Sequence, residues 1–485
     1  MNCVDYLFEN TRTFQKSFLV GTPKEESYQS IYEKSLLLAN HINHKVGIDK
    51  NILLISQNNS FFIIVYFAIL KSGNVCIPLN PTIEQDNLNF IINKTSAEIG
   101  FISELAYKKL NLSIEVYKEQ DLGSITHSGY ISNGQTIEFD GNRIAEIIFT
   151  SGSTAVPKGV MLTHNNIIAN TDSIIQYLNL NEADRIMVVL PFYYCYGLSL
   201  LHTHIRVGGQ LVINNNFIFL ASTIGKLNEY CCTGFAGVPS HFQILLRKTD
   251  LFKNTKFPCL RYVTQAGGKL ENVFILEFME FFPSINFFVM YGQTEATARL
   301  SYLPPHLLKR KIGSLGKGIP GVELKVVNPK GEVVQTGKTG EIIAKGDNVM
   351  KGYFNDPKES SKVIKNGWLY TGDIATVDNE GFIYLTARKK EIMKIGGKRI
   401  SPKEIEGIIY QIPGIIDCSV KAVADDLLGE AIKATIVVSE NETNIDEETI
   451  KRFCSSKLSN YKIPTLIDIK HEISISATGK KTFQS

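Results

Sequence analysis

Apolar residues change their spacing several times in the first hundred positions of the chain. Between residues 28 and 42 they recur every three or four positions, which predicts an amphipathic helix. Short apolar runs at 51–56 and 75–79 predict buried strands, and the apolar segment 61–71 between them, which stops before Gly73, predicts a buried helix. The order strand, helix, strand predicts βαβ units around a parallel sheet.

The alternation continues to the end of the chain. Residues 120–142 are polar and contain glycine, which predicts a surface connection. Further strands, the last two of them in a small antiparallel unit, are expected at 187–190, 259–264, 287–290, 322–327 and 341–345. The last hundred residues or so, the size of a small α/β domain, have elements expected at 404–410, 432–438 and 447–458.

Composition limits the classes of function. The chain has 485 residues, enough for about three domain-sized units. A formal net charge of +3 is too small to favour a nucleic-acid partner or an acidic membrane surface. The eight cysteines form no C-x2-C pair, which favours reduced thiols in a cytoplasmic enzyme. The N-terminus carries acids, so no signal peptide is expected, and the apolar segment 61–70 is too short to span a membrane.

A candidate phosphate site lies in residues 147–164, IIFTSGSTAVPKGVMLTH. An apolar run leads into five small residues with hydroxyl groups or no side chain, followed by a lysine: Thr150, Ser151, Gly152, Ser153, Thr154 and Lys158. Unpaired backbone N–H groups, hydroxyl donors and one lysine suit a phosphate. The spacing differs from the P-loop, because Gly159 stands where that motif needs a hydroxyl residue. A flexible surface loop is the alternative interpretation of this composition.

Two later strands also run into small or polar residues. The strand at 259–264 is followed by Gly267, Gly268 and Lys269, and the strand at 287–290 by Tyr291, Gly292, Gln293, Thr294 and Glu295. Ligands collect at the carboxyl ends of strands in open α/β sheets, so all three loops are expected to be walls of one crevice. Tyr291 offers a face for stacking a purine, Thr294 can donate to a phosphate, and Glu295 is a suitable ligand for Mg²⁺.

These segments resemble the motifs of the adenylate-forming superfamily, which includes acyl-CoA ligases, luciferases and the adenylation domains of peptide synthetases. The phosphate segment is similar to the superfamily pattern T-S-G-[ST]-T-G-x-P-K-G, with Ala155 where the family has glycine. LKSGNVCIPLNP, PFYYCYG, YGQTE, WLYTGD and the terminal GK resemble further motifs in the family's order. The resemblance implies an α/β fold: a large N-terminal part of doubly wound sheets with a small β-barrel-like unit, and a small mobile α/β lid.

The resemblance also implies roles for individual residues. Asp373 would bind the two ribose hydroxyls, Arg388 the ribose or phosphate, and Glu295 the magnesium ion. Lys480 would enter the active site as the catalytic lysine, supported by Thr294 and Lys158. The hinge would be Lys390, which divides the chain into 1–389 and 390–485. Gly397 would line the thiol tunnel. Tyr194, Gly237 and Gly268 would line the acid pocket.

The implied reaction is ATP-dependent activation of a carboxylic acid to an acyl-adenylate with release of pyrophosphate. The acyl group would then pass to CoA or to the phosphopantetheine of an acyl carrier protein. An amino-acid adenylation protein that loads a separate peptidyl carrier is the alternative, disfavoured because no aspartate near Tyr194 pairs with a substrate ammonium. A binding protein on an inactive enzyme scaffold is a third possibility, supported only by Ala155, whose Cβ disfavours a positive φ.

Overall fold

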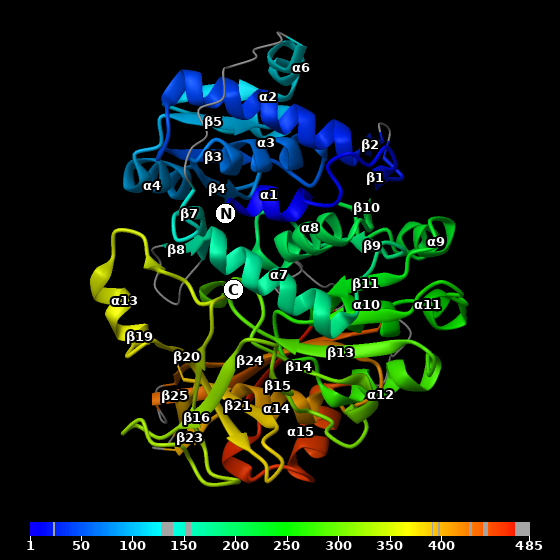
Figure 1. Cartoon of the computed structure of the whole chain (residues 1–485). Helices are drawn as coiled ribbons and strands as arrows, with labels where there is room; N and C mark the ends of the chain where they lie inside the picture. The colour runs from blue at the N-terminus through cyan, green and yellow to red at the C-terminus, as the bar shows by residue number, and fades with distance from the viewer. Residues whose placement is uncertain are drawn as a thin grey trace.

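The structure is a computed structural model that describes residues 1–22, 25–127, 139–150, 157–389, 391–395, 398–425, 429–439 and 445–470. Two large mixed sheets form most of it (Figure 1). The seven-stranded sheet has the order β18 (Gly352–Tyr353), β8 (Lys158–Thr163), β7 (Ile144–Thr150), β4 (Val75–Leu79), β3 (Asn51–Ile55), β5 (Ile99–Ile102) and β6 (Glu115–Lys118). Strands β4, β3, β5 and β6 pair in parallel, as the βαβ pattern predicts.

The second large sheet has nine strands. Their order is β15 (Lys317–Gly318), β14 (Ser301–Leu303), β13 (Asn286–Tyr291), β12 (Tyr262–Gln265), β11 (Gly234–Gly237), β9 (Arg185–Val188), β10 (Gln210–Ile213), β1 (Ser17–Val20) and β2 (Glu26–Ser27). The strands β9, β11, β12 and β13 are parallel, so their carboxyl ends lie at one edge of the sheet. That edge carries the loops after Gly237, Gln265 and Tyr291.

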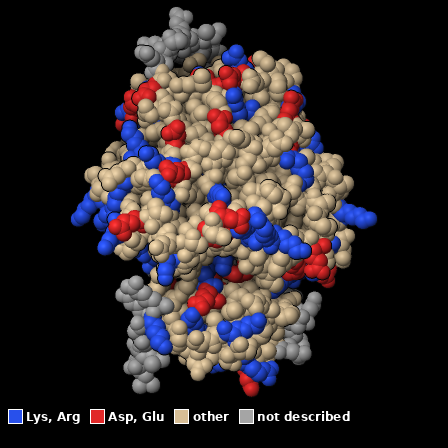
Figure 2. All heavy atoms as spheres, turned by 60° about the horizontal axis from the view of Figure 1, so that its bottom comes forward, with Lys and Arg blue, Asp and Glu red and all other residues tan. Residues whose placement is uncertain are grey.

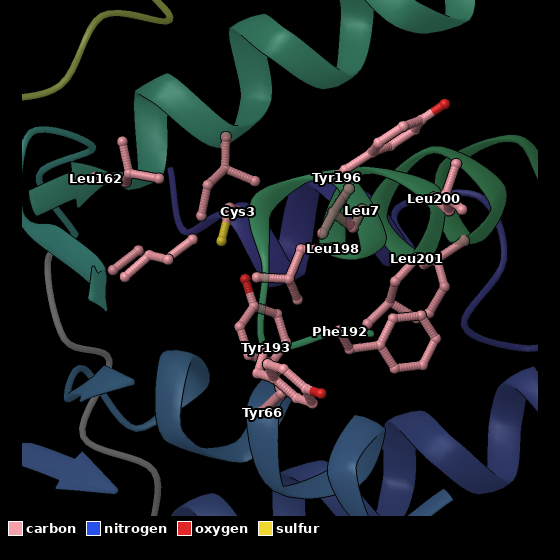
Figure 3. Packing of buried hydrophobic residues seen from close by; sticks show 14 of the residues in the cluster. Cys3, Leu7, Tyr66, Leu162, Phe192, Tyr193, Tyr196, Leu198, Leu200 and Leu201 are labelled. Atoms are coloured by element: carbon pink, nitrogen blue, oxygen red, sulfur yellow. The ribbon is translucent and has the colours of Figure 1, made fainter. Parts of the chain in front are cut away.

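A layer of helices fills the space between the two sheets (Figure 1). It consists of α1 (Cys3–Phe8), α2 (Tyr28–Val46), α3 (Ser60–Lys71), α7 (His164–Leu178) and α8 (Cys195–Val207). Ten successive residues of α3 are buried, which explains why its sequence is apolar on every face. In Figure 3, Tyr66 of α3 lies beside Phe192 and Tyr193 in the interior, whereas Tyr196 of α8 points away from this group.

Further helices pack around the two sheets. They are α4 (Gln85–Thr95), α5 (Glu104–Tyr107), α6 (Glu119–His127), α9 (Leu220–Glu229), α10 (Pro239–Arg247), α11 (Asp250–Asn254), α12 (Asn272–Phe281) and α13 (Pro357–Val363), with short 3-10 turns η1 (Thr294–Ala296) and η2 (Pro305–Leu307). The prediction of a surface connection over 120–142 is wrong at its start, where α6 forms. This helix has two acids in its first turn, which favour its N-terminus.

A small antiparallel sheet follows, as the turn-separated short strands predict. It contains β16 (Glu323–Val327), β17 (Gly340–Lys345), β19 (Ile364–Lys365), β20 (Trp368–Val377) and β21 (Ile383–Arg388). Among the described residues no helix is long and apolar enough to cross a membrane. On the face drawn in Figure 2, basic and acidic side chains are interspersed, in keeping with the small net charge.

The C-terminal part alternates strands and helices. Its described elements are β22 (Met393–Ile395), β23 (Lys398–Ile400), α14 (Pro402–Ile409), β24 (Ile415–Asp425), β25 (Gly429–Val438), α15 (Glu447–Ser455), η3 (Asn460–Lys462) and β26 (Leu466–Lys470). It packs against α10 and α12, where Arg247 Nη1 donates to the Ile415 carbonyl oxygen at 2.6 Å. The rings of Phe274 and Tyr410 meet edge to face across the same contact, with centroids 5.4 Å apart.

One carboxyl group is buried in the layer between the sheets. Glu146 of β7 is 1% exposed, and Tyr66 Oη donates to its Oε2 at 2.8 Å. Tyr66 Oη also lies 2.9 Å from His202 Nε2. Burial raises the pKa of Glu146 to about 7, while the Tyr66 hydrogen bond opposes the shift. The folded protein therefore holds Glu146 as a neutral acid in a pH range where the unfolded chain ionises it.

This burial predicts a pH dependence of stability. Between about pH 4.5, the ordinary pKa, and about pH 7, folding takes up a proton at Glu146, so the free energy of unfolding falls as pH rises. Glu146→Gln removes the decline, and its stability relative to wild type should rise by about 3 kcal/mol between pH 5 and 8. Urea denaturation at both pH values measures it. The exposed Glu182→Gln is the control, and an equal pH dependence in both variants would contradict the assignment.

Candidate active site

Three predicted nucleotide-binding residues meet at the end of β13. Tyr291 Oη donates to Asp373 Oδ2 at 2.7 Å, and Arg388 Nε lies 3.2 Å from Asp373 Oδ1. Asp373 and Arg388 are opposite residues in the β20–β21 pairing, which fixes their separation. Asp373 is only 6% exposed, and burial raises its pKa, whereas Arg388 and the Tyr291 hydroxyl act to lower it. The cluster is a carboxylate and a cation held side by side, suited to hydroxyl and phosphate groups.

Glu295 lies four residues beyond Tyr291, in the turn η1. Its Oε1 accepts a hydrogen bond from Tyr353 Oη at 2.8 Å, and its carbonyl oxygen accepts from Met350 N at 2.9 Å. Tyr353 belongs to β18, an edge strand of the seven-stranded sheet, whereas β13 belongs to the nine-stranded sheet. The Tyr353 hydrogen bond therefore connects the Glu295 carboxylate, which follows β13 of the nine-stranded sheet, to the edge strand β18 of the seven-stranded sheet.

Gly292 has a steric requirement for glycine. A Cβ at this position would lie 2.0 Å from the Ala298 carbonyl oxygen, far inside van der Waals contact. The chain turns back on itself here, and Thr297 in the same turn has a φ of 63°. Gln293, Thr294 and Glu295 lie in the turn that this close approach closes. Thr294 Oγ1 lies 3.5 Å from Cys195 Sγ at the start of α8.

The predicted phosphate loop joins β7 and β8. These strands form a hairpin in which Thr150 pairs with Lys158, and the Thr150 hydroxyl donates to the Lys158 carbonyl oxygen at 3.5 Å. Its strand β7 lies in the seven-stranded sheet, whereas β12 and β13 lie in the nine-stranded sheet. The three loops therefore come from two sheets, which the contacts of Glu295 join.

Lys158 lies beside the residues that hold Glu295. Its Nζ lies 2.6 Å from Glu359 Oε2 and 5.3 Å from the ring centroid of Tyr353. Lys158 and Lys362 lower the pKa of Glu359 to about 2, so this carboxylate is ionised at all ordinary pH values. Tyr353 contacts both the predicted phosphate-binding lysine and the predicted metal ligand.

The residues predicted to form the acid pocket lie at neighbouring strand ends. Gly237 of β11 is opposite Gln265 of β12, and Gln265 Nε2 donates to the Gly268 carbonyl oxygen at 2.7 Å. A Cβ at Gly237 would lie 3.0 Å from Phe242, which is closer than ordinary van der Waals contact. This part of the pocket wall therefore favours a residue without a side chain. Tyr194 is half-buried at the N-terminus of α8, its ring centroid 4.8 Å from that of Tyr193.

Lys269, which is predicted to line the nucleotide site, forms an ion pair with Glu271. Its Nζ lies 3.2 Å from Glu271 Oε2, next to the C-terminal part of the chain. A Cβ at Gly407 of α14 would lie 3.0 Å from the same Glu271 oxygen. The side chain of Lys269 is thus placed at the border between the large part and the C-terminal part.

Several predicted site residues lie outside the described part of the chain. They are Ser151, Gly152, Ser153, Thr154, Lys390, Gly397 and Lys480, and Ala155 is among the same undescribed positions. Their roles stay predictions. Sequence reasoning missed Tyr353 and Glu359, since neither residue type nor spacing in KGYFNDPKES connects them to Glu295 or Lys158. The pairing of β18 with β8 brings Tyr353 there, and α13, which packs on β18, carries Glu359.

The sequence pattern of AMP-binding enzymes matches residues 9–354, and that of the AMP-binding enzyme C-terminal domain matches residues 404–480. The first match alone covers more than half of the chain. The chain belongs to the AMP-binding enzyme family. The resemblance predicted from the sequence is therefore confirmed.

Two curated relatives align with most of this chain. An oxalate–CoA ligase of Arabidopsis thaliana is 29% identical over 447 residues, covering 88% of this chain and 86% of the relative. A long-chain-fatty-acid–CoA ligase of Escherichia coli is 28% identical over 499 residues, covering 94% and 88%. Both are CoA ligases, although their named acids differ greatly in size and polarity.

A solved relative supports the fold. The o-succinylbenzoate CoA synthetase of Bacillus subtilis, in complex with its acyl-adenylate intermediate, superposes with a TM-score of 0.84 at 24% identity, covering 99% of this chain and 96% of that one. The same synthetase with ATP and a magnesium ion gives a TM-score of 0.83 at 24% identity, covering 99% and 98%. The predicted α/β fold, with a large N-terminal part and a small C-terminal part, is confirmed.

Proposed function

We propose that the loops around Glu295 and Asp373 bind ATP and a carboxylic acid and join them as an acyl-adenylate, whose acyl group then passes to a thiol. The single observation that carries these residue roles is the Tyr291–Asp373–Arg388 cluster, since a buried carboxylate beside a cation suits a ribose next to a phosphate. Lys158 and the hydroxyl groups of Thr150 and Thr294 would contact the phosphates.

The family and the curated relatives together support the overall activity. The protein is an AMP-forming acid–thiol ligase that uses ATP and Mg²⁺ to activate a carboxylic acid and CoA as the thiol acceptor. The curated relatives are CoA ligases, and one solved relative holds an acyl-adenylate. The alternative of an amino-acid adenylation protein receives no support from these relatives. The acids named for these relatives differ from one another, so the relatives do not identify the acid that this chain uses. That acid has to be inferred from the residues of the pocket.

The first chemical step needs no general base. A carboxylic acid, with an ordinary pKa of roughly 4.3, is ionised at neutral pH. One of its oxygens attacks the α-phosphorus of ATP, and the bond from that phosphorus to pyrophosphate breaks. The protein's part is to align the two anions and to offset their repulsion, with Lys158, Arg388 and Lys480 as the proposed cations.

The donor set around Glu295 fits a magnesium ion. Tyr353 occupies one carboxylate oxygen of Glu295, and a single carboxylate combined with phosphate oxygens is a common ligand set for Mg²⁺. Mg²⁺ held by Glu295 and the triphosphate would neutralise phosphate charge. Tyr353 orients the carboxylate through its hydrogen bond, so the ligand does not have to be ordered when the nucleotide binds.

In the second step the thiol sulfur attacks the acyl carbon, and the carbon–oxygen bond to AMP breaks. We propose that the segment 390–485 is a lid that turns at Lys390 relative to 1–389. This rotation would withdraw Lys480 and bring Gly397 to the site, where it would line the thiol's path. An acyl carrier protein in place of CoA, and a cytoplasmic location, remain predictions from the sequence; a comparison of CoA with a phosphopantetheinylated carrier would test the former.

The nucleotide site can be tested through the ribose. Asp373→Ala should raise the KM for ATP by about tenfold to a hundredfold, because two hydrogen bonds to a charged group are lost. Wild type should also prefer ATP to 2′-deoxyATP by about tenfold or more, and the variant should treat the two nucleotides nearly alike. Acid-dependent pyrophosphate release measures both values. An unchanged preference in Asp373→Ala would show that Asp373 does not contact the ribose.

A further inference from the structure

Arg299 is a buried cation in an unusual environment. It is 2% exposed and lies four residues beyond Glu295. Its Nη1 donates to the carbonyl oxygen of the adjacent Ala298 at 3.3 Å, and its Nε has no hydrogen-bond partner among the described residues. Within the described part of the chain no carboxylate lies within ion-pair distance of its guanidinium, whereas Arg206, Arg247 and Arg261 each meet one.

The contacts that Arg299 does make do not compensate its charge. The guanidinium carbon lies 3.9 Å from the ring centroid of Tyr196. A desolvated cation–π contact offsets only part of the free energy that is lost when an unpaired ion is removed from water. Tyr177 also lies near: burial raises the pKa of its hydroxyl, whereas the charge of Arg299 and a hydrogen bond with Arg299 act to lower it. A hydroxyl group is neutral, so this contact leaves the charge of Arg299 without a counter-ion. An anionic ligand that reaches the guanidinium would supply the counter-charge that the described residues do not provide.

The backbone of Arg299 is held in place by two amides. Asn348 Nδ2 donates to the Arg299 carbonyl oxygen at 2.7 Å, and Asn170 Nδ2 of α7 donates to the same oxygen at 3.3 Å. These bonds fix the backbone of Arg299 beside α7, and the ring of Tyr196 in α8 holds the guanidinium in place. Fixed donors of this kind discriminate strongly between ligands, because little ordering is left to occur on binding.

The position of Arg299 connects it to the proposed acid pocket. Tyr196, which it contacts, lies two residues beyond Tyr194 in the first turn of α8 and points away from the interior group of Tyr66 and Tyr193 (Figure 3). Tyr196 Oη lies 2.9 Å from Thr264 Oγ1 of β12, the strand that leads to Gly268. The guanidinium thus lies among the elements that carry both Tyr194 and Gly268.

We propose that Arg299 determines specificity by binding a second anionic group, a carboxylate, at the far end of the acid substrate. This inference rests on the proposed function, since the first carboxylate must be the one that is activated. The substrate class is then a dicarboxylic acid rather than an acid with an apolar tail. A neutral tail would leave the guanidinium buried and unpaired, so such acids are rejected.

The test compares dicarboxylic acids of several lengths with their monomethyl esters, which differ only in the charge of the tail. In acid-dependent pyrophosphate release, wild type should show kcat/KM values about a hundredfold higher for the preferred diacid than for its ester. Arg299→Met should lose most of this preference by lowering the diacid value, and Arg299→Lys should keep part of it. Arg310→Met, at a side chain that is 60% exposed, is the matched control and should change neither value.

The outcomes separate this inference from the proposed function. If wild type uses ester and diacid equally well, or if Arg299→Met keeps the wild-type ratio while melting at a lower temperature, Arg299 is structural and the inference fails while the ligase activity stands. If no acid supports pyrophosphate release, the proposed function fails and the inference with it. Should Arg299→Met not fold, the wild-type ratio alone decides, because a buried arginine that binds the tail requires it to favour the diacid.

Discussion

Lys480→Ala is expected to slow acid-dependent ATP–pyrophosphate exchange by about a thousandfold. The predicted role of Lys480 is to bridge the carboxylate and the α-phosphate in the transition state, and preorganised cations of this kind contribute about a hundredfold to a thousandfold each. The reaction of a synthetic acyl-adenylate with CoA should stay within about threefold of wild type, because that step does not use the lysine. Radiolabelled pyrophosphate exchange and thioester formation measure the two steps separately.

Lys481→Ala is the control for this prediction. The neighbouring lysine has the same charge and nearly the same place in the sequence, so a general loss of positive charge would affect both variants equally. A selective loss in Lys480→Ala assigns the role to that residue. Unimpaired exchange in Lys480→Ala, or an equal loss in both steps, would contradict it.

Glu295→Gln is expected to lower kcat/KM for ATP by about a hundredfold and to raise the Mg²⁺ concentration needed for half-maximal rate. Glutamine keeps the shape and can still accept the hydrogen bond of Tyr353, which Glu295 Oε1 now accepts at 2.8 Å. What is lost is the negative charge, which a hard divalent cation requires. Titration of activity with Mg²⁺ at fixed ATP measures the change.

Tyr353→Phe separates the charge of Glu295 from its orientation. It removes only the hydroxyl, so the loss should be smaller, about tenfold, as is typical when a residue that orients a metal ligand is removed. The Mg²⁺ requirement should rise in the same direction. A Glu295→Gln enzyme with the wild-type Mg²⁺ requirement would show that the ion is held elsewhere.

Local patterns in the sequence predicted much of the large part of the fold. The predicted strand at 75–79 is β4 with the same bounds, and the helix predicted at 28–42 is the first part of α2, Tyr28–Val46. These segments have strong periodicity or a fully apolar run bounded by turn residues. The helix α6 was missed because its polar sequence resembles that of a loop, and its existence depends on packing beside α2 and β6.

The sequence predicts the individual loops of the candidate site. It does not predict how these loops come together. The sequence indicated Tyr291, Asp373 and Arg388 as nucleotide-binding residues, but the register that places Asp373 opposite Arg388 depends on sheet pairing. The origin of the three loops in two different sheets has no local signal either, since strand order depends on contacts between distant segments. Tyr353 and Arg299 have no local pattern, and only their burial and partners indicate a role.

A rapid-quench experiment without thiol tests whether this protein forms an acyl-adenylate. Wild-type enzyme, Mg²⁺, ATP and an accepted acid should form one acyl-adenylate and one pyrophosphate per active site and then stop, with AMP appearing only when CoA is added. Mass spectrometry of the bound nucleotide detects the intermediate. If ATP is instead cleaved to ADP and phosphate, or if AMP appears without any acyl-adenylate, the protein does not activate the acid through an acyl-adenylate.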